Sequence, residues 1–251
     1  MELLISPREG WTLLTLNRPA ARNAVTTVLL GALADRLDQL AADPACRVVV
    51  VTGAEGNFAA GADIDEIATK GSAEGAADPR KGHWARVRAF PKPLIAAVDG
   101  FALGGGFELA LMADAMVLGA TARVGLPETS LGILPGAGGG QRLLALVGRA
   151  RASRMVLTGE IIDAPTALAW GIAAWGAEGP ALPVAETLAA TLASRAPLAL
   201  RTAKRALVTG DETRLDLAGE RAGFEALLAT ADKAEGIAAF REKRKPLFRG
   251  E

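Results

Sequence analysis

The chain has 251 residues, half of them hydrophobic, so it is long enough for one large domain or two smaller ones with a sizeable core. Lys+Arg and Asp+Glu both total 28, and a net charge of zero argues against bulk attraction to nucleic acid or to an anionic membrane. With one cysteine and one histidine, the sequence excludes an intrachain disulfide framework and a zinc site of the HExxH type.

The first part of the chain predicts two strands, a helix and a strand. Residues 2–6 and 11–16 read as the strands of a hairpin. Thr26 is placed to cap a helix whose leucines between residues 29 and 40 recur at helical spacing. The β-branched run 47–52 then predicts a buried strand. This order indicates a βαβ arrangement with a parallel sheet.

A glycine-rich loop over residues 53–61 follows, and the small residues 59–62 allow close approach to the backbone. Either a strand-to-helix turn that needs small residues or a binding loop accounts for this composition. Asp63 is placed to cap the next helix. Residues 70–81 are polar and small, which predicts a mobile loop, and residues 83–90 predict a short amphipathic helix.

The most informative stretch is residues 92–142. Residues 94–98 predict a buried strand, and a glycine triplet, residues 104–106, precedes a predicted helix over residues 107–113. Glycines at a helix N-terminus present free N–H groups and the positive end of the helix dipole without a Cβ in the way. This arrangement favours binding an oxygen that carries or acquires negative charge.

Two glutamates accompany the glycine triplet. Glu108 lies in the first turn of the predicted helix, where acidic residues are favoured in any case. Glu128 follows Pro127 in a loop, where a lone carboxylate is ordinarily solvated. Together, beside an anion-stabilising backbone, they indicate acid–base chemistry on a carbonyl compound. Their spacing in the sequence does not show that they meet in space.

The glycine clusters do not match the common nucleotide-binding patterns. A G-x-G-x-x-G motif needs its third glycine three places after the second, and after residues 136–140 that place is occupied by Gln141. The Gly-Lys-Ser/Thr sequence of a Walker A loop is absent. A nicotinamide dehydrogenase or a nucleoside triphosphatase is therefore disfavoured.

The rest of the chain predicts two short strands, at residues 116–118 and 123–126, and then a series of helices. Helical spacing of apolar residues is found over 141–147, 150–157, 164–170, 182–195, 198–208, 213–230 and 233–248. We therefore expect an α/β core in residues 1–195 and a helical region in residues 196–251. The short apolar run at the N-terminus, without basic residues before it, is no signal peptide, which predicts a cytoplasmic location.

Two blocks of this sequence resemble the enoyl-CoA hydratase/isomerase (crotonase) family. Residues 58–64 read FAAGADI, similar to FsAGADi in the family, and residues 95–110 read IAAVDGFALGGGFELA, similar to IAAVnGyAlGGGcELa. Pro127-Glu128 and LGILPGAGGGQRL (131–143) complete the pattern. The resemblance runs from about Leu13 to Phe248. It implies an α/β crotonase (ClpP/crotonase-like) fold of repeated ββα units with a helical C-terminal trimerisation region, assembled as a homotrimer or a dimer of trimers.

The resemblance also implies a reaction and the residues that perform it. The expected reaction adds water to a trans-2-enoyl-CoA thioester and gives a 3-hydroxyacyl-CoA, with no cofactor besides the CoA of the substrate and no metal. Glu108 would help to activate the water and Glu128 would protonate the α-carbon. The residues matching Ala62 and Gly105 would donate the two N–H groups of an oxyanion hole.

Further residues match positions that bind the CoA ester in the family. They are Arg22, Ala24, Ala60, Ala62, Asp63, Ile64, Asp65, Gly104, Gly105, Phe240 and Lys243. Phe240 and Lys243 would reach the adenosine phosphate end of CoA bound to a neighbouring subunit, whereas without the family the basic tail reads as a solvated helix end. Gly140 stands where the family usually has threonine, which predicts a looser loop near the second glutamate.

Several local blocks are similar to the 2,3-dehydroadipyl-CoA hydratases of phenylacetate catabolism: residues 16–24, 84–98, 124–128 and 153–160. A substrate with a distal carboxylate calls for a cation near its tail, and the candidates are Lys70, Arg80, Lys81, Arg86 and Arg88. Each of them taken singly is also explained as a solvated surface charge. A general fatty-acyl hydratase and a Δ3-Δ2 enoyl-CoA isomerase remain alternatives, and zero net charge argues against an RNA-binding module.

Overall fold

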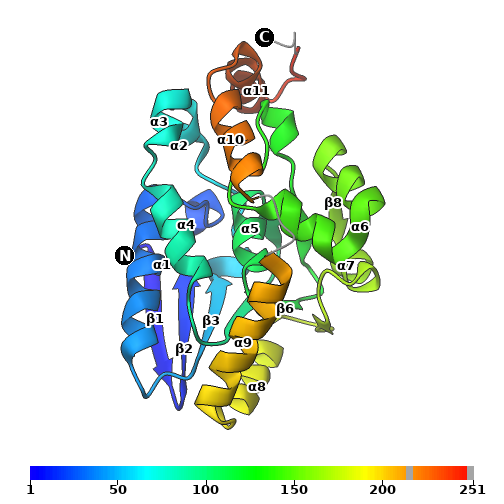
Figure 1. The fold of residues 1–251 in the computed structure, drawn as a ribbon. Helices are drawn as coiled ribbons and strands as arrows, with labels where there is room; N and C mark the ends of the chain where they lie inside the picture. Colours follow the sequence, from blue (N-terminus) through cyan, green and yellow to red (C-terminus); the bar gives the residue numbers. More distant parts are fainter. Residues whose placement is uncertain (213–216, 248–251) are drawn as a thin grey trace.

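The computed structural model describes residues 1–212 and 217–247 of the chain (Figure 1). Its centre is a six-stranded sheet with the order β1–β2–β3–β4–β6–β9. β1 and β2 form the predicted antiparallel hairpin, and the neighbouring pairs from β2 to β9 are parallel. The strands are β1 (Leu3–Arg8), β2 (Trp11–Leu16), β3 (Val48–Gly53), β4 (Leu94–Val98), β6 (Ala115–Leu118) and β9 (Trp175–Gly176).

A second, three-stranded sheet has the order β5–β7–β8. It is made of β5 (Phe101–Leu103), β7 (Arg123–Gly125) and β8 (Ile161–Asp163). Consecutive strands alternate between the two sheets and are followed by a helix, as β4-β5-α5 and β6-β7-α6, with α5 at Gly105–Leu111 and α6 at Gly139–Thr158. The predicted α/β class with repeated ββα units is therefore confirmed. β5, β8 and β9 are too short to give a period in the sequence, and none of them was predicted.

Helix α1 (Thr27–Ala42) shows why the N-terminal prediction is correct. The hydroxyl oxygen of Thr26 accepts a hydrogen bond from the Leu29 N–H at 3.0 Å and caps the helix as predicted. The leucines at helical spacing are buried: Leu29, Leu33, Leu37 and Leu40. They belong to the same apolar core as Val49 and Val51 of β3, so α1 completes the predicted βαβ unit.

Helix α8 (Leu182–Ala193) covers the opposite face of the sheet. Its buried alanines, 185, 189 and 193, pack with Val48 and Val50, the residues of β3 that alternate with those facing α1. β3 is therefore buried on both faces, which explains its continuous run of valines. The next helix along the chain, α9 (Pro197–Glu212), lies beside α8 in Figure 1.

The segment 70–81 differs from its prediction as a mobile loop. It contains helix α3 (Ser72–Ala76), and helix α4 (Arg80–Arg88) begins within it. Asp78 is buried, where its carboxylate accepts from the Arg80 N–H at 2.9 Å and from the Lys70 ammonium at 2.7 Å. Hydrogen bonds to polar side chains, rather than apolar residues at helical spacing, order this segment. The prediction was wrong because it took the small and polar composition as the sign of a mobile loop.

Helix α7 (Ala164–Trp170) has its predicted bounds. The remaining helices gather at one end of the molecule (Figure 1). α2 (Ile64–Ala68), α10 (Leu217–Leu227) and α11 (Ala231–Glu242) surround a separate apolar cluster whose buried members are Ile67, Ile133, Leu228 and Ile237. Of the predicted helix limits, Thr213 and Phe248 lie outside the described residues. A division of the chain at residue 195 stays a prediction.

In residues 1–212 and 217–247, no helix has both the length and the apolar composition that crossing a lipid bilayer requires.

Candidate active site

A cavity of about 290 Å³ lies where α2, α4, α5, α10 and α11 converge. It brings together predicted site residues that are far apart in the sequence: Ala60, Ala62, Ile64, Gly104, Gly105, Glu108, Glu128 and Phe240. α4 and α10 add residues that the sequence did not assign to the site, among them Trp84 and Arg221. The two predicted glutamates and the two predicted N–H donors therefore share one cavity.

The two predicted donors lie side by side. A Cβ on Gly105 would stand 3.5 Å from the Ala62 nitrogen. The loop around Ala62 is held by hydrogen bonds from the Val25 N–H to Gly61 O at 2.8 Å and from the Asp63 N–H to Val25 O at 3.2 Å. In the described part of the chain, the N–H groups of Ala62 and Gly105 donate to no protein acceptor. The pair can therefore hold an oxygen on which negative charge develops.

Each of the other glycines of the triplet makes a close approach that a side chain would block. A Cβ on Gly106 would lie 2.1 Å from the Ala59 carbonyl oxygen, so α5 packs directly on the loop that carries Ala62. Gly104 has φ +48° and ψ −127°, a conformation available in practice to glycine only. Its N–H donates to Gly125 O at 2.9 Å, which ties the triplet to β7.

Substituting Gly104 by alanine should damage both stability and activity. The positive φ costs about 1–3 kcal/mol for a residue with a side chain. In addition, the new Cβ would lie 3.0 Å from the Glu128 Oε1 and push that carboxylate away. We expect a lower midpoint in chemical denaturation and a lower kcat. The control is Gly82→Ala in α4, where a Cβ meets nothing within 4 Å, and unchanged stability of Gly104→Ala would contradict this account.

Glu108 is held in place by two backbone donors. Its Oε1 accepts hydrogen bonds from the N–H groups of Ala137 at 2.7 Å and Gly139 at 2.9 Å. Gly139 must lack a side chain because a Cβ there would lie 2.7 Å from the Glu108 Cγ. Burial raises the pKa of Glu108, while these N–H groups and the charges of Arg142 and Arg80 oppose the rise. These donors and charges favour the ionised form of Glu108.

Glu128 has a different environment. It begins a short 3₁₀ helix, Glu128–Leu131, and is buried rather than solvated. Its Oε2 is buried and has no hydrogen-bond partner among the residues that the structure describes. Burial raises the pKa of Glu128 well above its usual range, and the nearby charge of Glu108 raises it further. Burial therefore favours a proton on Glu128 more strongly than on Glu108, whose backbone donors and neighbouring cations favour its charged form.

A third carboxylate, Glu220 on α10, was missed by the sequence reasoning. Its Oε2 accepts from the Gln141 N–H at 3.1 Å in the first turn of α6, and its buried Oε1 has no partner within residues 1–212 and 217–247. Gly140 makes room for it, since a Cβ there would lie 2.4 Å from that Oε2. Gly140 thus lies inside a helix, and the expectation of a looser loop is wrong. The glycine at position 140, where the family usually has threonine, was the sequence signal that could have pointed to Glu220.

Glu220 should make the protein less stable as the pH rises. Burial and the charge of Glu108 raise the pKa of Glu220 from 4.5 to about 7. A pKa that is higher in the folded state stabilises the fold at low pH, and this contribution is lost between pH 4.5 and about 7. Between pH 5 and pH 8, the free energy of unfolding should fall by about 1–3 kcal/mol less in Glu220→Gln than in the parent protein.

Urea denaturation at the two pH values measures this difference. Glu225→Gln is the contrasting variant, because ion pairing with Arg221 lowers the pKa of Glu225. A lowered pKa stabilises the fold above pH 4.5, and this contribution is lost only as the pH falls below that value, so Glu225→Gln should lower stability about equally at pH 5 and pH 8. Equal pH dependence in Glu220→Gln and in the parent protein would contradict the raised pKa.

Some predicted binding residues do not line the cavity. They are Arg22, Ala24, Asp63, Asp65 and Lys243. Arg22 lies close by, because its carbonyl accepts from the Ala60 N–H at 2.9 Å, whereas Asp63 pairs with Arg18 at 3.0 Å and caps α2. Lys243 ends α11. Their contact with CoA, and the part of a neighbouring subunit, stay predictions.

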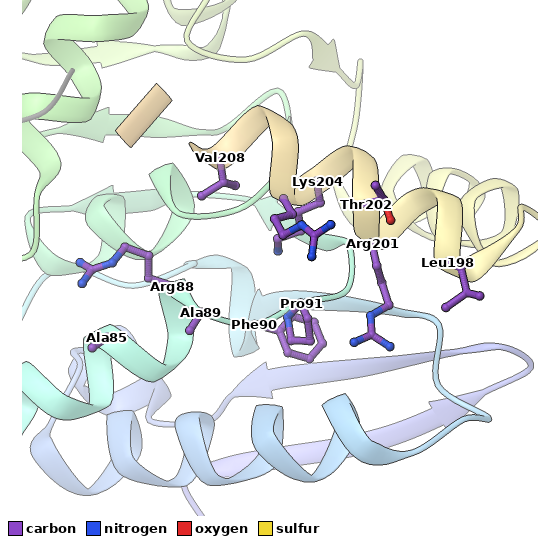
Figure 2. Close-up of a pocket in the computed structure, with 11 residues that line it drawn as sticks. Ala85, Arg88, Ala89, Phe90, Pro91, Leu198, Arg201, Thr202, Lys204 and Val208 are labelled. Carbon is purple, nitrogen blue, oxygen red and sulfur yellow. The ribbon is translucent and has the colours of Figure 1, made fainter. Parts of the chain in front are cut away.

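A second cavity, of about 630 Å³, lies between α4 and α9 (Figure 2). Its walls carry Arg88, Arg201 and Lys204 around Phe90. Lys204 is already paired, with Asp114 at 2.8 Å. Within the described part of the chain, the candidate cation Arg88 lines this cavity but the predicted catalytic, oxyanion-hole and CoA-binding residues do not, so the chemistry points to the smaller one. Residues 1–212 and 217–247 contain no group of three His, Cys, Asp or Glu side chains arranged to hold a metal ion.

Comparisons with known proteins agree with this geometry. The chain is 50% identical over 252 residues to the 2,3-dehydroadipyl-CoA hydratase of Escherichia coli (strain K12), with 99% of each protein covered. It is 42% identical over 251 residues to a probable enoyl-CoA hydratase of Rhizobium meliloti, covering 98% of this chain and 97% of that protein.

The fold has close matches among solved structures. The crystal structure of an enoyl-CoA hydratase from Mycobacterium avium subsp. paratuberculosis matches with a TM-score of 0.88 at 32% identity, and 99% of each chain is covered. The predictions of a crotonase fold and of an enoyl-CoA hydratase are confirmed. A model of the enoyl-CoA hydratase/isomerase family matches residues 8–251. The chain therefore belongs to the enoyl-CoA hydratase/isomerase family.

Proposed function

We propose that this cavity hydrates trans-2-enoyl-CoA thioesters with Ala62, Gly105, Glu108 and Glu128 as the reacting groups, without a further cofactor. The observation that carries the proposal is the pairing of unlike carboxyl groups beside free N–H donors. Glu108 accepts two backbone hydrogen bonds that favour its charged form, whereas Glu128 is buried with an Oε2 that has no partner among the described residues, which favours its protonated form. Hydration requires one group of each kind.

The reaction begins with the thioester carbonyl oxygen accepting hydrogen bonds from the N–H groups of Ala62 and Gly105. These bonds polarise the conjugated double bond and make C3 electrophilic. Glu108 takes a proton from water as the water oxygen bonds to C3, and the electron pair of the double bond moves onto the enolate. Glu128 then gives its proton to C2, which completes the addition. Proton exchange through solvent resets the two carboxyl groups after the product leaves.

The oxyanion pair contributes a large part of the expected rate. The enolate oxygen carries more charge than the carbonyl oxygen of the bound substrate, so N–H donors fixed in advance stabilise the transition state more than the ground state. One such donor is typically worth about 10²–10³ in kcat. A Δ3-Δ2 isomerase, the alternative within the family, needs only one carboxylate to move its proton, so the unlike pair favours hydration.

We propose 2,3-dehydroadipyl-CoA as the substrate. The support is the 50% identity over nearly the whole chain to a relative that bears this substrate in its name. The competing assignment is a general hydratase of plain fatty-acyl chains. The two differ in whether the acyl chain ends in a carboxylate or in a methyl group.

Loss of the conjugated enoyl-thioester absorbance tests both proposals, with crotonyl-CoA and 2,3-dehydroadipyl-CoA compared side by side. A much higher kcat/KM for the dicarboxylic substrate is expected. Preference for crotonyl-CoA would identify a general fatty-acyl hydratase. If neither thioester loses absorbance, hydration itself is refuted.

We also propose that the chain acts as a homotrimer or a dimer of trimers, in which Phe240 and Lys243 serve the CoA of a neighbour. Phe240 is 61% exposed although it lines the cavity, so it has surface available for a further contact. Light scattering of the purified protein measures the assembly, and a monomer at assay concentration would refute this proposal.

A further inference from the structure

Arg80 is a buried cation on the wall of the active-site cavity. It is the first residue of α4 and is only 6% exposed. Among the described residues, its guanidinium has one acceptor, Glu66 Oε2, at the long distance of 3.5 Å from Nη1. That acceptor already receives hydrogen bonds from the N–H and the hydroxyl of Thr27. A guanidinium has five N–H donors, so most of the hydrogen-bonding capacity of Arg80 is unused by the protein.

The other cations that line this cavity are well paired. The Lys70 ammonium lies 2.7 Å from the Asp78 carboxylate. Arg221 donates to Glu225 at 2.7 Å and to Gly75 O at 2.9 Å. Among the cavity residues that the structure describes, Arg80 is therefore the cation with the least complete set of partners.

The remaining cations considered from the sequence lie elsewhere. Lys81 pairs with Glu225 at 2.9 Å, and Arg86 pairs with Asp35 and Asp38 at 2.6 Å on the surface. Arg88 lines the cavity between α4 and α9. The tertiary structure thus selects Arg80 from the five candidates.

The position of Arg80 suits the far end of a short acyl chain. Arg80 and Glu108 line the same cavity, and burial lowers the pKa of Arg80 while the charges of Asp78, Glu66 and Glu108 oppose that fall. Trp84, one turn along α4, lines the same cavity with Ile67 and Leu228 and offers apolar surface to methylene groups. A chain that starts at the N–H donors and passes the glutamates can end at the guanidinium.

We propose that Arg80 binds the terminal carboxylate of a dicarboxylic enoyl-CoA and selects this substrate over a plain acyl chain. The planar guanidinium fork matches a carboxylate with two parallel hydrogen bonds. A plain chain with a terminal methyl group leaves the buried cation without that partner and is disfavoured. The inference rests on the proposed hydration at this cavity and adds the residue that recognises the substrate tail.

The test compares 2,3-dehydroadipyl-CoA with trans-2-hexenoyl-CoA, which has the same six-carbon chain without the second carboxylate. In the parent protein, kcat/KM should favour the dicarboxylic substrate. Arg80→Met should lower that preference by roughly 30- to 5,000-fold, the usual loss when one partner of a buried charged hydrogen bond is removed. Arg80→Lys, which keeps the charge but loses the fork, should restore part of it.

Two further measurements separate recognition from folding and from chemistry. Lys81→Met is the matched control, because it removes the next cation along α4, which pairs with Glu225 and does not line the cavity, and it should leave the ratio of the two kcat/KM values unchanged. Inhibition by the saturated analogues adipyl-CoA and hexanoyl-CoA measures binding without hydration. Arg80→Met should weaken the binding of adipyl-CoA and leave the binding of hexanoyl-CoA nearly unchanged.

The possible outcomes distinguish this inference from the proposed function. An equal loss for both substrates in Arg80→Met, or an unchanged preference for the dicarboxylic one, overturns the role of Arg80 while hydration stands. Tight, Arg80-dependent binding of adipyl-CoA by a protein that hydrates neither substrate refutes the proposed function and supports Arg80 as the carboxylate site. A similar preference loss in Lys81→Met would also overturn the inference.

Discussion

Glu128→Gln should lower kcat by about 10²–10⁴-fold, the range associated with a positioned general acid. Glutamine has the shape of the protonated glutamic acid, but its amide has no acidic proton to give to C2. The substitution breaks no protein hydrogen bond at Oε2, because that oxygen is buried without a partner. Substrate binding should therefore survive, and the loss should fall on the chemical step.

Single-turnover absorbance measurements with saturating thioester isolate that step, and inhibition by the saturated analogue reports binding. Ser130→Ala is the matched control, since Ser130 lines the same cavity in the same 3₁₀ helix and its hydroxyl donates to Pro127 O at 2.6 Å. The control should change the rate only a few-fold. Near-normal turnover in Glu128→Gln would sink the assignment of the acid.

Glu108→Gln should also lower kcat by about 10²–10⁴-fold, for the opposite reason: an amide cannot take a proton from water. The Gln carbonyl oxygen can keep the hydrogen bonds from the N–H groups of Ala137 and Gly139, which Glu108 Oε1 now accepts at 2.7 and 2.9 Å. The fold and the cavity should therefore be retained. Thermal denaturation beside the single-turnover rate separates lost chemistry from lost structure.

The double variant Glu108→Gln/Glu128→Gln examines whether the two carboxyl groups act as a unit. Groups that serve one transition state give losses far from additive, so the double variant should be little slower than the slower single variant. If the loss of kcat in the double variant equals the product of the two single losses, the two glutamates act independently. A large loss in only one of the single variants would favour the isomerase alternative, which needs one carboxylate.

Local patterns in the sequence were enough to predict many of the helices and strands of this fold. Thr26 and the leucines that follow it predict α1 because a cap and a helical period depend only on near neighbours. The run of valines in β3 and the glycine triplet before α5 are local signals of the same kind. The family blocks placed both glutamates and both N–H donors, since the resemblance carries positions that local spacing does not explain.

The tertiary structure alone decided the chemical state of those groups. Glu128 reads as a solvated loop residue in the sequence, yet it is buried beside Glu108, and this burial raises its pKa and favours its protonated form. Glu220 reaches the first turn of α6 from α10, and Arg80 becomes a buried cation through packing between distant segments. Burial and the distance between charges set pKa values and pairing, and both arise from contacts between residues far apart in the chain.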